Sequence, residues 1–263
     1  MGELKNINFK KKFGQNFITD KNLLKAIVND AQVNSEDVVI EIGAGAGTLT
    51  SEIAKKAKKV VSFEVDKELQ SVLDENLADF DNINIIYEDF LNFDEEKIYN
   101  LAGNKFKVVA NLPYYITTPI ITKLFEMKNR PEVIVVMVQK EVGERIVADP
   151  QSGNYGYFSV YVNANAEAKI IRIVNRNMFT PAPKVDSCII LLKLRNKNYP
   201  KEFFEFLKNV FKMKRKTILN NIVASYPFNK QQLEEKVGEE VLKKRADALD
   251  LDSLYKIYNE IFN

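Results

Sequence analysis

Residues 38–50 read VVIEIGAGAGTLT, and this stretch decides the fold prediction for the whole chain. Its aliphatic residues predict a buried strand, its glycines at positions 43, 45 and 47 predict a tight turn, and a helix is predicted to open at about Thr48. Glycine adopts φ > 0 and has no Cβ, so the backbone can turn here and come close to a ligand. A glycine turn between a strand and a helix is typical of the pocket floor in a doubly wound α/β sheet that binds a nucleotide.

Two details of this stretch narrow the prediction. The glycines follow G-x-G-x-G, which falls short of the G-x-G-x-x-G pattern of dinucleotide pyrophosphate sites. Glu41 places an acid inside an otherwise apolar strand. Glycine turns also follow strands in proteins where nothing binds, so the turn alone does not identify a ligand.

The composition excludes several classes of chemistry. The chain has 263 residues, 46% of them hydrophobic, which is enough for a full core. It has no histidine, which excludes Ser-His-Asp triads, Cys-His pairs and imidazole metal ligands. The single cysteine, Cys188, allows neither an internal disulfide nor a multi-cysteine zinc site, so we expect no metal and a reducing cytoplasm. No apolar leader and no run of about 18 apolar residues is present, which predicts a soluble protein without a membrane partner.

Basic residues gather near both ends of a chain whose net charge is only +2. Two basic clusters on a near-neutral protein predict a polyanion partner. The alternative is that each cluster is only a solvated surface. The candidate RNA-binding residues in the two clusters are Lys10, Lys11, Lys12, Lys208, Lys212 and Arg215.

Polar side chains follow the next three predicted strands at the points where these strands end. Glu64 lies at the end of the second strand, 21 positions after Gly43, a spacing that suits hydrogen bonds from ribose hydroxyls. Asp89 follows the third strand, where it could accept a hydrogen bond from an exocyclic amine, and Asn111 follows the fourth. The alternatives are a helix N-terminal carboxylate at Glu64 and an ordinary turn residue at Asp89. Because parallel strands end at one edge of a sheet, we expect these side chains to share a pocket.

The loop at residues 111–120, NLPYYITTPI, is where chemistry is expected. Pro113 removes an amide donor and stiffens the turn. Tyr114 and Tyr115 provide flat faces for stacking. Phe179 precedes two prolines in FTPAPKVDS and is therefore a rigidly mounted ring, although core packing is the default for a phenylalanine.

The remaining pattern predicts two domains joined by a polar, breaker-rich linker at residues 195–200. Residues 1–195 are expected to hold the sheet and the N-terminal arm, and residues 196–263 a small helical RNA-binding domain. Strands are predicted at 38–42, 60–65, 83–87, 106–110, 133–138 and 188–194, and strand-like alternation returns at 158–162. Helices are predicted after Asp20 and at 49–57, 67–78, 116–128, 139–148, 203–218, 231–244 and 253–262.

The strand ends together can hold a nucleoside but offer no pyrophosphate cradle and no Walker lysine, which weakens NAD and ATP as candidates. A nucleoside cofactor without phosphates suggests S-adenosylmethionine. Its sulfonium is already activated, so methyl transfer needs alignment and charge placement more than acid/base groups. This requirement agrees with a chain that lacks histidine.

The chain resembles the rRNA adenine N6-dimethyltransferases, which modify two adjacent adenosines near the 3′ end of small-subunit rRNA. The resemblance covers essentially the whole chain and includes KKFGQNFITD, VIEIGAGAGTLT, ANLPYYITTPI, FTPAPKVDS, FKMKRKTILNN and RADALDLDSL. It implies a Rossmann-like, seven-stranded and mostly parallel methyltransferase sheet followed by a C-terminal all-helical domain. It also implies S-adenosylmethionine as cofactor and, as substrate, the rRNA of an assembling 30S-type particle, methylated by a monomer in the cytoplasm.

The resemblance further implies the roles of individual residues. The expected cofactor contacts are Asn16, Ile18, Gly43, Glu64, Asp89 and Asn111. The expected catalytic set is Asn111, Leu112, Pro113 and Tyr114, with Phe179 stacking on the target base from the other side. Tyr115 stands where other family members often carry asparagine and is left out of this set.

The expected catalytic residues suggest how N6 of the target adenine could be activated as a nucleophile. The N6 lone pair is delocalised into the adenine ring, which makes the nitrogen a poor nucleophile. The Asn111 side-chain oxygen and the Leu112 carbonyl could accept its two hydrogens and favour a pyramidal nitrogen, while aromatic rings stack on the unstacked base.

Two other functions stay open. A large-subunit rRNA adenine N6-methyltransferase of the macrolide-resistance type shares the fold and the chemistry, but typically has isoleucine at the position of Leu112 and a different tail. A ribosome-assembly factor that binds RNA without methylating it is the second alternative.

Overall fold

The computed structural model describes residues 17–18, 20–196 and 199–263, which divide into two compact units. The first unit combines the chain up to Gly143 with Lys169–Leu194, and the second combines Glu144–Ala168 with Arg195–Asn263. The contacts therefore group residues 144–168 with the C-terminal helices, whereas the sequence-based boundary assigned them to the first domain. The division into domains at 1–195 and 196–263 stays a prediction.

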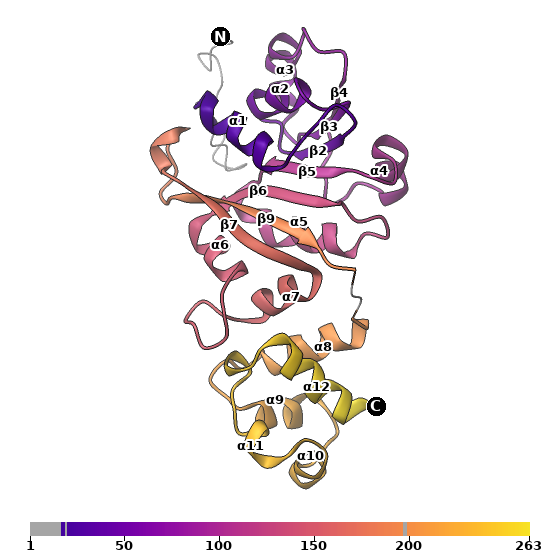
Figure 1. Cartoon of the computed structure of the whole chain (residues 1–263), viewed down its shortest axis with the longest axis vertical. Coiled ribbons are helices and arrows are strands. Elements are labelled where there is room, and N and C mark those ends of the chain that lie inside the picture. The colour runs from indigo at the N-terminus through magenta and orange to yellow at the C-terminus, as the bar shows by residue number, and fades with distance from the viewer. Residues whose placement is uncertain (1–16, 19, 197–198) are drawn as a thin grey trace. The chain divides into compact units, whose positions relative to one another are not determined.

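A seven-stranded sheet with the order β4-β3-β2-β5-β6-β9-β7 forms the centre of the first unit (Figure 1). Its strands are β2 (Val38–Ile42), β3 (Lys59–Phe63), β4 (Ile83–Ile86), β5 (Lys107–Asn111), β6 (Val133–Gln139), β7 (Ala166–Val174) and β9 (Ser187–Leu194). The first five of these run parallel, and β9 is antiparallel to β6. The predicted Rossmann-like, mostly parallel sheet is confirmed. The order reverses between β2 and β5, and such a switch point is where doubly wound sheets bind ligands.

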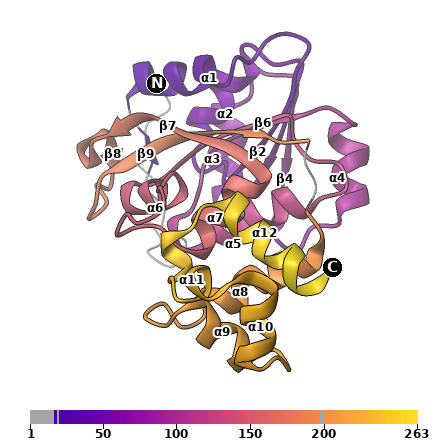
Figure 2. The ribbon, with the colours of Figure 1, turned by 60° about the horizontal axis from the view of Figure 1, so that its bottom comes forward.

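Successive side chains of the central strands point to opposite faces of the sheet, and those on one face build the core beneath the first helices. Val39, Val109 and Val135 point to the same face and pack in one buried cluster with residues of α1 (Lys21–Asp30) and α2 (Thr48–Ala54). Helix α1 begins after Asp20, as predicted, and the Asp20 side chain caps it by accepting a hydrogen bond from the Leu23 amide at 2.8 Å. Figure 2 shows α1 on one side of the strands and α5 (Thr117–Glu126) on the other.

A two-stranded antiparallel sheet lies beside this core. It consists of β1 (Phe17–Ile18) and β8 (Phe179–Thr180), with Ile18 opposite Phe179 and Phe17 opposite Thr180. Strands of two residues carry no periodic signal, so the sequence did not predict them.

Three stretches of the first 174 residues differ from their predictions. The alternation at 158–162 belongs to a helix, α7 (Tyr157–Asn165), not to a strand. Strand β7 follows it directly and was not predicted, nor was α4 (Glu95–Ala102). A short apolar run such as FSVYV cannot be assigned to strand or helix by its periodicity alone. The other two helices of this part are α3 (Gln70–Asn76) and α6 (Lys140–Ile146).

The second unit packs its helices around buried aromatic and aliphatic side chains. The C-terminal helices are α8 (Lys201–Val210), α9 (Ile218–Ser225), α10 (Lys230–Val237), α11 (Glu239–Leu242) and α12 (Leu251–Phe262), which confirms the all-helical tail. The helix predicted over 203–218 is wrong in its length, because α8 ends at Val210 and Lys212 and Arg215 lie in the connection to α9. The helix predicted over 231–244 is interrupted at Gly238, whose φ is 93°. Among the described residues, no helix is both long enough and apolar enough to cross a membrane.

Candidate active site

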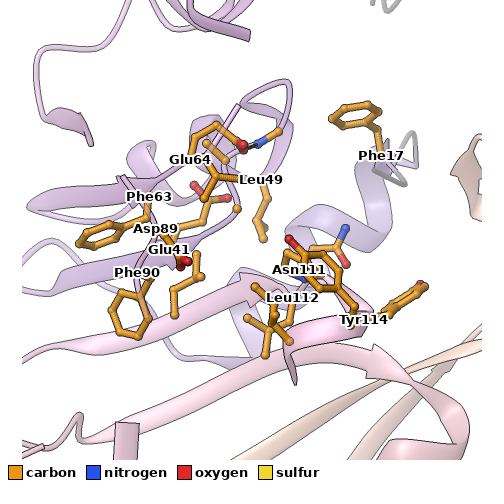
Figure 3. Close-up of a pocket in the computed structure, with 18 of the residues that line it drawn as sticks. Phe17, Glu41, Leu49, Phe63, Glu64, Asp89, Phe90, Asn111, Leu112 and Tyr114 are labelled. Atoms are coloured by element: carbon orange, nitrogen blue, oxygen red, sulfur yellow. Dashed lines mark hydrogen bonds between the residues drawn. The ribbon is translucent and has the colours of Figure 1, made fainter. Parts of the chain in front are cut away.

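A pocket opens where β2, β3 and β5 reach their carboxyl ends, as Figure 3 shows. Strand pairing holds the ends of β2, β3 and β4 at one level, because Ile42 pairs with Phe63 and Phe63 pairs with Ile86. The Gly43 amide then donates to the Phe63 carbonyl at 2.8 Å, and the Glu64 amide donates to the Ile86 carbonyl at 2.9 Å. The register of the sheet therefore brings the glycine turn and Glu64 to the same edge.

The glycine turn forms one wall of this pocket. Gly43, Gly45 and Gly47 have φ values of 88°, 57° and 77°, in the region that favours glycine. An added Cβ at Gly45 would lie 2.7 Å from the ring of Phe17, whereas one at Gly43 would lie 3.6 Å from Pro113 Cδ. Gly45 is thus the position where β1 approaches the turn too closely for a side chain.

The Glu64 side chain links the end of β3 to the glycine turn through hydrogen bonds. Its Oε2 accepts a hydrogen bond from the Gly45 amide at 2.8 Å, and its Oε1 accepts one from the Asp66 amide at 2.8 Å. The side chain is buried, and burial raises its pKa above the usual range despite these hydrogen bonds. A carboxylate oxygen can accept more than one hydrogen bond, so both oxygens keep capacity for ribose hydroxyls.

Glu41 is a pocket residue to which the sequence assigned no role. It is 0% exposed, and its Oε2 accepts hydrogen bonds from Thr50 Oγ1 at 2.6 Å and Ser62 Oγ at 2.7 Å. Its Oε1 has no hydrogen-bond partner among the described residues. Burial raises the pKa of Glu41 to about 8, and the neighbouring Glu64 adds to that shift. The signal was present in the sequence as an acid within an apolar strand.

The loop after β5 lines the pocket next to the glycine turn (Figure 3). Asn111 ends the strand, and the Leu112 amide donates to the Met137 carbonyl of β6 at 3.1 Å, which fixes the loop to the sheet. The Tyr114 hydroxyl lies 2.7 Å from Ser187 Oγ, and Ser187 is fully buried. Burial raises the pKa of Tyr114, so its hydroxyl stays protonated at neutral pH. The ring is therefore held at both its backbone and its hydroxyl end.

Asp89 lines the pocket from the turn after β4. Its Oδ1 accepts a hydrogen bond from the Leu91 amide at 2.9 Å, and its Oδ2 accepts one from Asn92 Nδ2 at 3.2 Å. Asp89 therefore stabilises its own turn, as the alternative interpretation proposed, and it also lines the pocket.

Eight of the predicted site residues line this pocket: Ile18, Gly43, Glu64, Asp89, Asn111, Leu112, Pro113 and Tyr114. Phe179 is not among the lining residues; its side chain is 3% exposed and packs in the core cluster with α1 and α2. Its stacking on a base stays a prediction. Asn16, Lys10, Lys11 and Lys12 lie outside the described residues. Lys208, Lys212 and Arg215 are exposed residues of the second unit.

The charges around the pocket fit S-adenosylmethionine. The lining includes three buried or half-buried carboxyl groups, Glu41, Glu64 and Asp89, and no lysine or arginine among the described residues. Acidic side chains without a basic one in the described lining oppose a phosphate and suit a cationic ligand. No cluster of metal-ligating side chains occurs in the described part of the chain.

Comparisons with known proteins identify the family of this chain. Residues 6–261 match the family described as ribosomal RNA adenine dimethylase. The chain belongs to this family. It is an S-adenosylmethionine-dependent methyltransferase that dimethylates rRNA adenines.

Relatives with established names match nearly the whole of this chain. Ribosomal RNA small subunit methyltransferase A of Bacillus cereus is 40% identical over 97% of this chain and 91% of its own length. The protein of the same name from Bacillus pumilus is 41% identical over 96% of this chain and 91% of its own.

Solved structures show the same fold. A dimethyladenosine transferase from Plasmodium falciparum superposes with a TM-score of 0.76 and 27% identity, over 93% of this chain and 96% of its own. The 23S rRNA methyltransferase ErmE reaches a TM-score of 0.68 over 94% of this chain and 100% of its own, but at 24% identity it supports the fold alone.

Proposed function

We propose that the substrate is small-subunit rRNA and that two adjacent adenosines near its 3′ end receive methyl groups from S-adenosylmethionine at N6, giving N6,N6-dimethyladenosines. The relatives that are 40–41% identical over nearly the whole chain are named small-subunit methyltransferases, which supports this choice. The observation that carries the reaction is one pocket in which acidic strand ends adjoin the Asn111–Tyr114 loop.

On the cofactor side, the proposal assigns binding to Ile18, Gly43, Glu64 and Asp89. S-adenosylmethionine supplies an activated methyl group when bound, so the protein has to align the two reactants. Glu64 would accept hydrogen bonds from the ribose hydroxyls, because its buried carboxylate is fixed by two backbone amides. Asp89 would accept one from the adenine amine, since its turn holds the carboxylate at the pocket wall.

On the substrate side, the loop after β5 would hold the target adenine. The Asn111 side-chain oxygen and the Leu112 carbonyl would accept the two N6 hydrogens and direct the nitrogen lone pair away from the ring. Tyr114 would stack on the base, and such stacking is worth about 1–3 kcal/mol per base. The hydrogen bond between Tyr114 and Ser187 supports this role, because it fixes the ring before the base arrives.

The RNA outside the pocket would be bound through its phosphates. Lys208, Lys212 and Arg215 are exposed and clustered in sequence, which suits contacts that carry no base specificity. The proposed substrate is the rRNA within an assembling 30S-type particle, late in subunit biogenesis, and the proposed enzyme is a monomer in the cytoplasm, where that substrate is assembled.

Methylation of purified ribosomal subunits tests the proposal. The protein and labelled S-adenosylmethionine are incubated separately with unmethylated small subunits and with large subunits, and the digested rRNA is analysed by mass spectrometry. We expect N6,N6-dimethyladenosine in the small subunit, and none when Asn111→Ala replaces the wild type. Label in the large subunit alone would refute the proposed substrate and favour the macrolide-resistance type of enzyme.

A further inference from the structure

Helix α5 carries a lysine that binds the loop following Asp89. Lys123 Nζ donates hydrogen bonds to three carbonyl oxygens, those of Phe90 at 2.7 Å, Leu91 at 3.0 Å and Phe93 at 2.7 Å. An ammonium group has three N–H donors, so this loop occupies all of them. The same nitrogen lies 5.1 Å from the centre of the Phe90 ring, within the range of a cation–π contact.

The loop that Lys123 binds is the one that orients Asp89. The Asp89 carboxylate accepts its hydrogen bond from the amide of Leu91, and the carbonyl of that same residue is bound by Lys123. The backbone at Leu91 is therefore held at its amide by the Asp89 carboxylate and at its carbonyl by the Lys123 ammonium group. A change in the position of these carbonyls would move the Leu91 amide and release the carboxylate.

The loop also packs against the residue that precedes Glu64. The rings of Phe90 and Phe93 lie 5.2 and 5.0 Å from the ring of Phe63, both in edge-to-face orientation. Phe63 ends β3, and Glu64 follows it directly. These aromatic contacts hold the loop from the sheet side even without the lysine, whereas the three carbonyls depend on the ammonium group.

We propose that Lys123 is a positioning residue for cofactor recognition, whose three hydrogen bonds to the 90–93 backbone keep the Asp89 carboxylate directed at the adenine amine of the cofactor. The inference rests on the role of Asp89 under the proposed function. Lys123 lines no part of the pocket itself and acts only through the loop. Replacement of Lys123 should therefore weaken the selective binding of a cofactor that contains adenine. Its effect on the stability of the fold should be smaller.

Binding of two product analogues tests this inference. S-adenosylhomocysteine has an amine at the purine 6-position, and S-inosylhomocysteine has an oxygen there. Isothermal titration with wild type should show a preference of roughly 10- to 100-fold for the adenosine compound, the size expected for a hydrogen bond to a charged group. In Lys123→Met the ratio of the two affinities should fall at least several-fold and approach the ratio measured for Asp89→Ala. The double variant should show little further loss of preference beyond that of either single variant.

Lys97→Met is the matched control. Lys97 is exposed and places its ammonium group 5.7 Å from the Phe93 ring, so it lies beside the same loop, but as a surface cation. Its removal should leave the binding ratio unchanged. If Lys123→Met does not fold, Lys123→Gln provides the same measurement, because its neutral amide cannot supply three donors from one nitrogen.

The outcomes separate this inference from the proposed function. An unchanged ratio in a folded Lys123 variant, with a normal preference in wild type, would overturn the inference alone. Equal binding of both compounds by wild type would overturn the role of Asp89 and the inference with it. A wild type that preferred the adenosine compound but did not methylate small subunits would overturn the proposed function and leave the role of Lys123 standing.

Discussion

Replacement of Glu41 by glutamine should change how the stability of this protein depends on pH. Burial raises the pKa of Glu41 from 4.5 to about 8 in the folded protein, and the unfolded chain has the ordinary value. Between these two values the folded state keeps a proton that the unfolded state has lost. A rise in pH through this range therefore favours unfolding, and the loss of stability ends once the folded group ionises near pH 8.

The magnitude follows from the size of the pKa shift. Each unit corresponds to about 1.4 kcal/mol, so the ligand-free wild type should lose about 5 kcal/mol from this group between pH 4.5 and pH 8. Glutamine does not titrate, and its side-chain oxygen can still accept hydrogen bonds from Thr50 and Ser62. At about 2–4 °C per kcal/mol, the Tm of wild type should fall by on the order of 10 °C relative to Glu41→Gln over this range.

Thermal unfolding followed by circular dichroism from pH 5 to pH 9 measures this difference. Titrating groups other than the neighbouring Glu64 affect both proteins alike, so the difference between the two curves reports Glu41 and its interaction with Glu64. A constant offset would reflect the altered hydrogen bonds and is compatible with the reasoning. Parallel curves over the whole range would refute it, because they would show that Glu41 titrates normally in the folded protein.

Three other substitutions test the site. Glu64→Ala removes the acceptor for two backbone amides and should abolish methylation while RNA affinity in a filter-binding assay stays largely unchanged; a collapse of RNA binding would contradict the separation of pocket and basic surface. Gly45→Ala places a Cβ against the Phe17 ring at a positive φ and should cost about 1–2 kcal/mol in the free energy of unfolding as well as weaken cofactor binding, both measurable by titration. Ser187→Ala releases the Tyr114 hydroxyl and should lower kcat about as much as Tyr114→Phe does, with no further loss in the double variant; additive losses would argue against a joint role.

The sheet was predictable because its signals are local. Strands β2 to β6 are mostly apolar runs of four to seven residues. Because parallel strands end at one edge of a sheet, the placement of Glu64, Asp89 and Asn111 at that edge could be predicted. Their meeting in one pocket required only that the strands be parallel and adjacent.

The contacts that hold the site are nonlocal and could not be predicted in this way. The partner of Tyr114 is a serine 73 positions away, and the carbonyls bound by Lys123 lie 30 to 33 positions before it. Phe179 packs in the core cluster with α1 and α2, and its stacking on a base stays a prediction. The alternating run in α7 shows that a short apolar segment does not reveal its own secondary structure.

The pairing of β1 with β8 has a consequence for the pocket wall. Ile18, which lines the pocket, is opposite Phe179, which begins the proline-containing loop leading to β9. Because the two strands are paired through their backbones, a displacement of the loop after Phe179 would also move Ile18 and the part of the pocket wall that it forms.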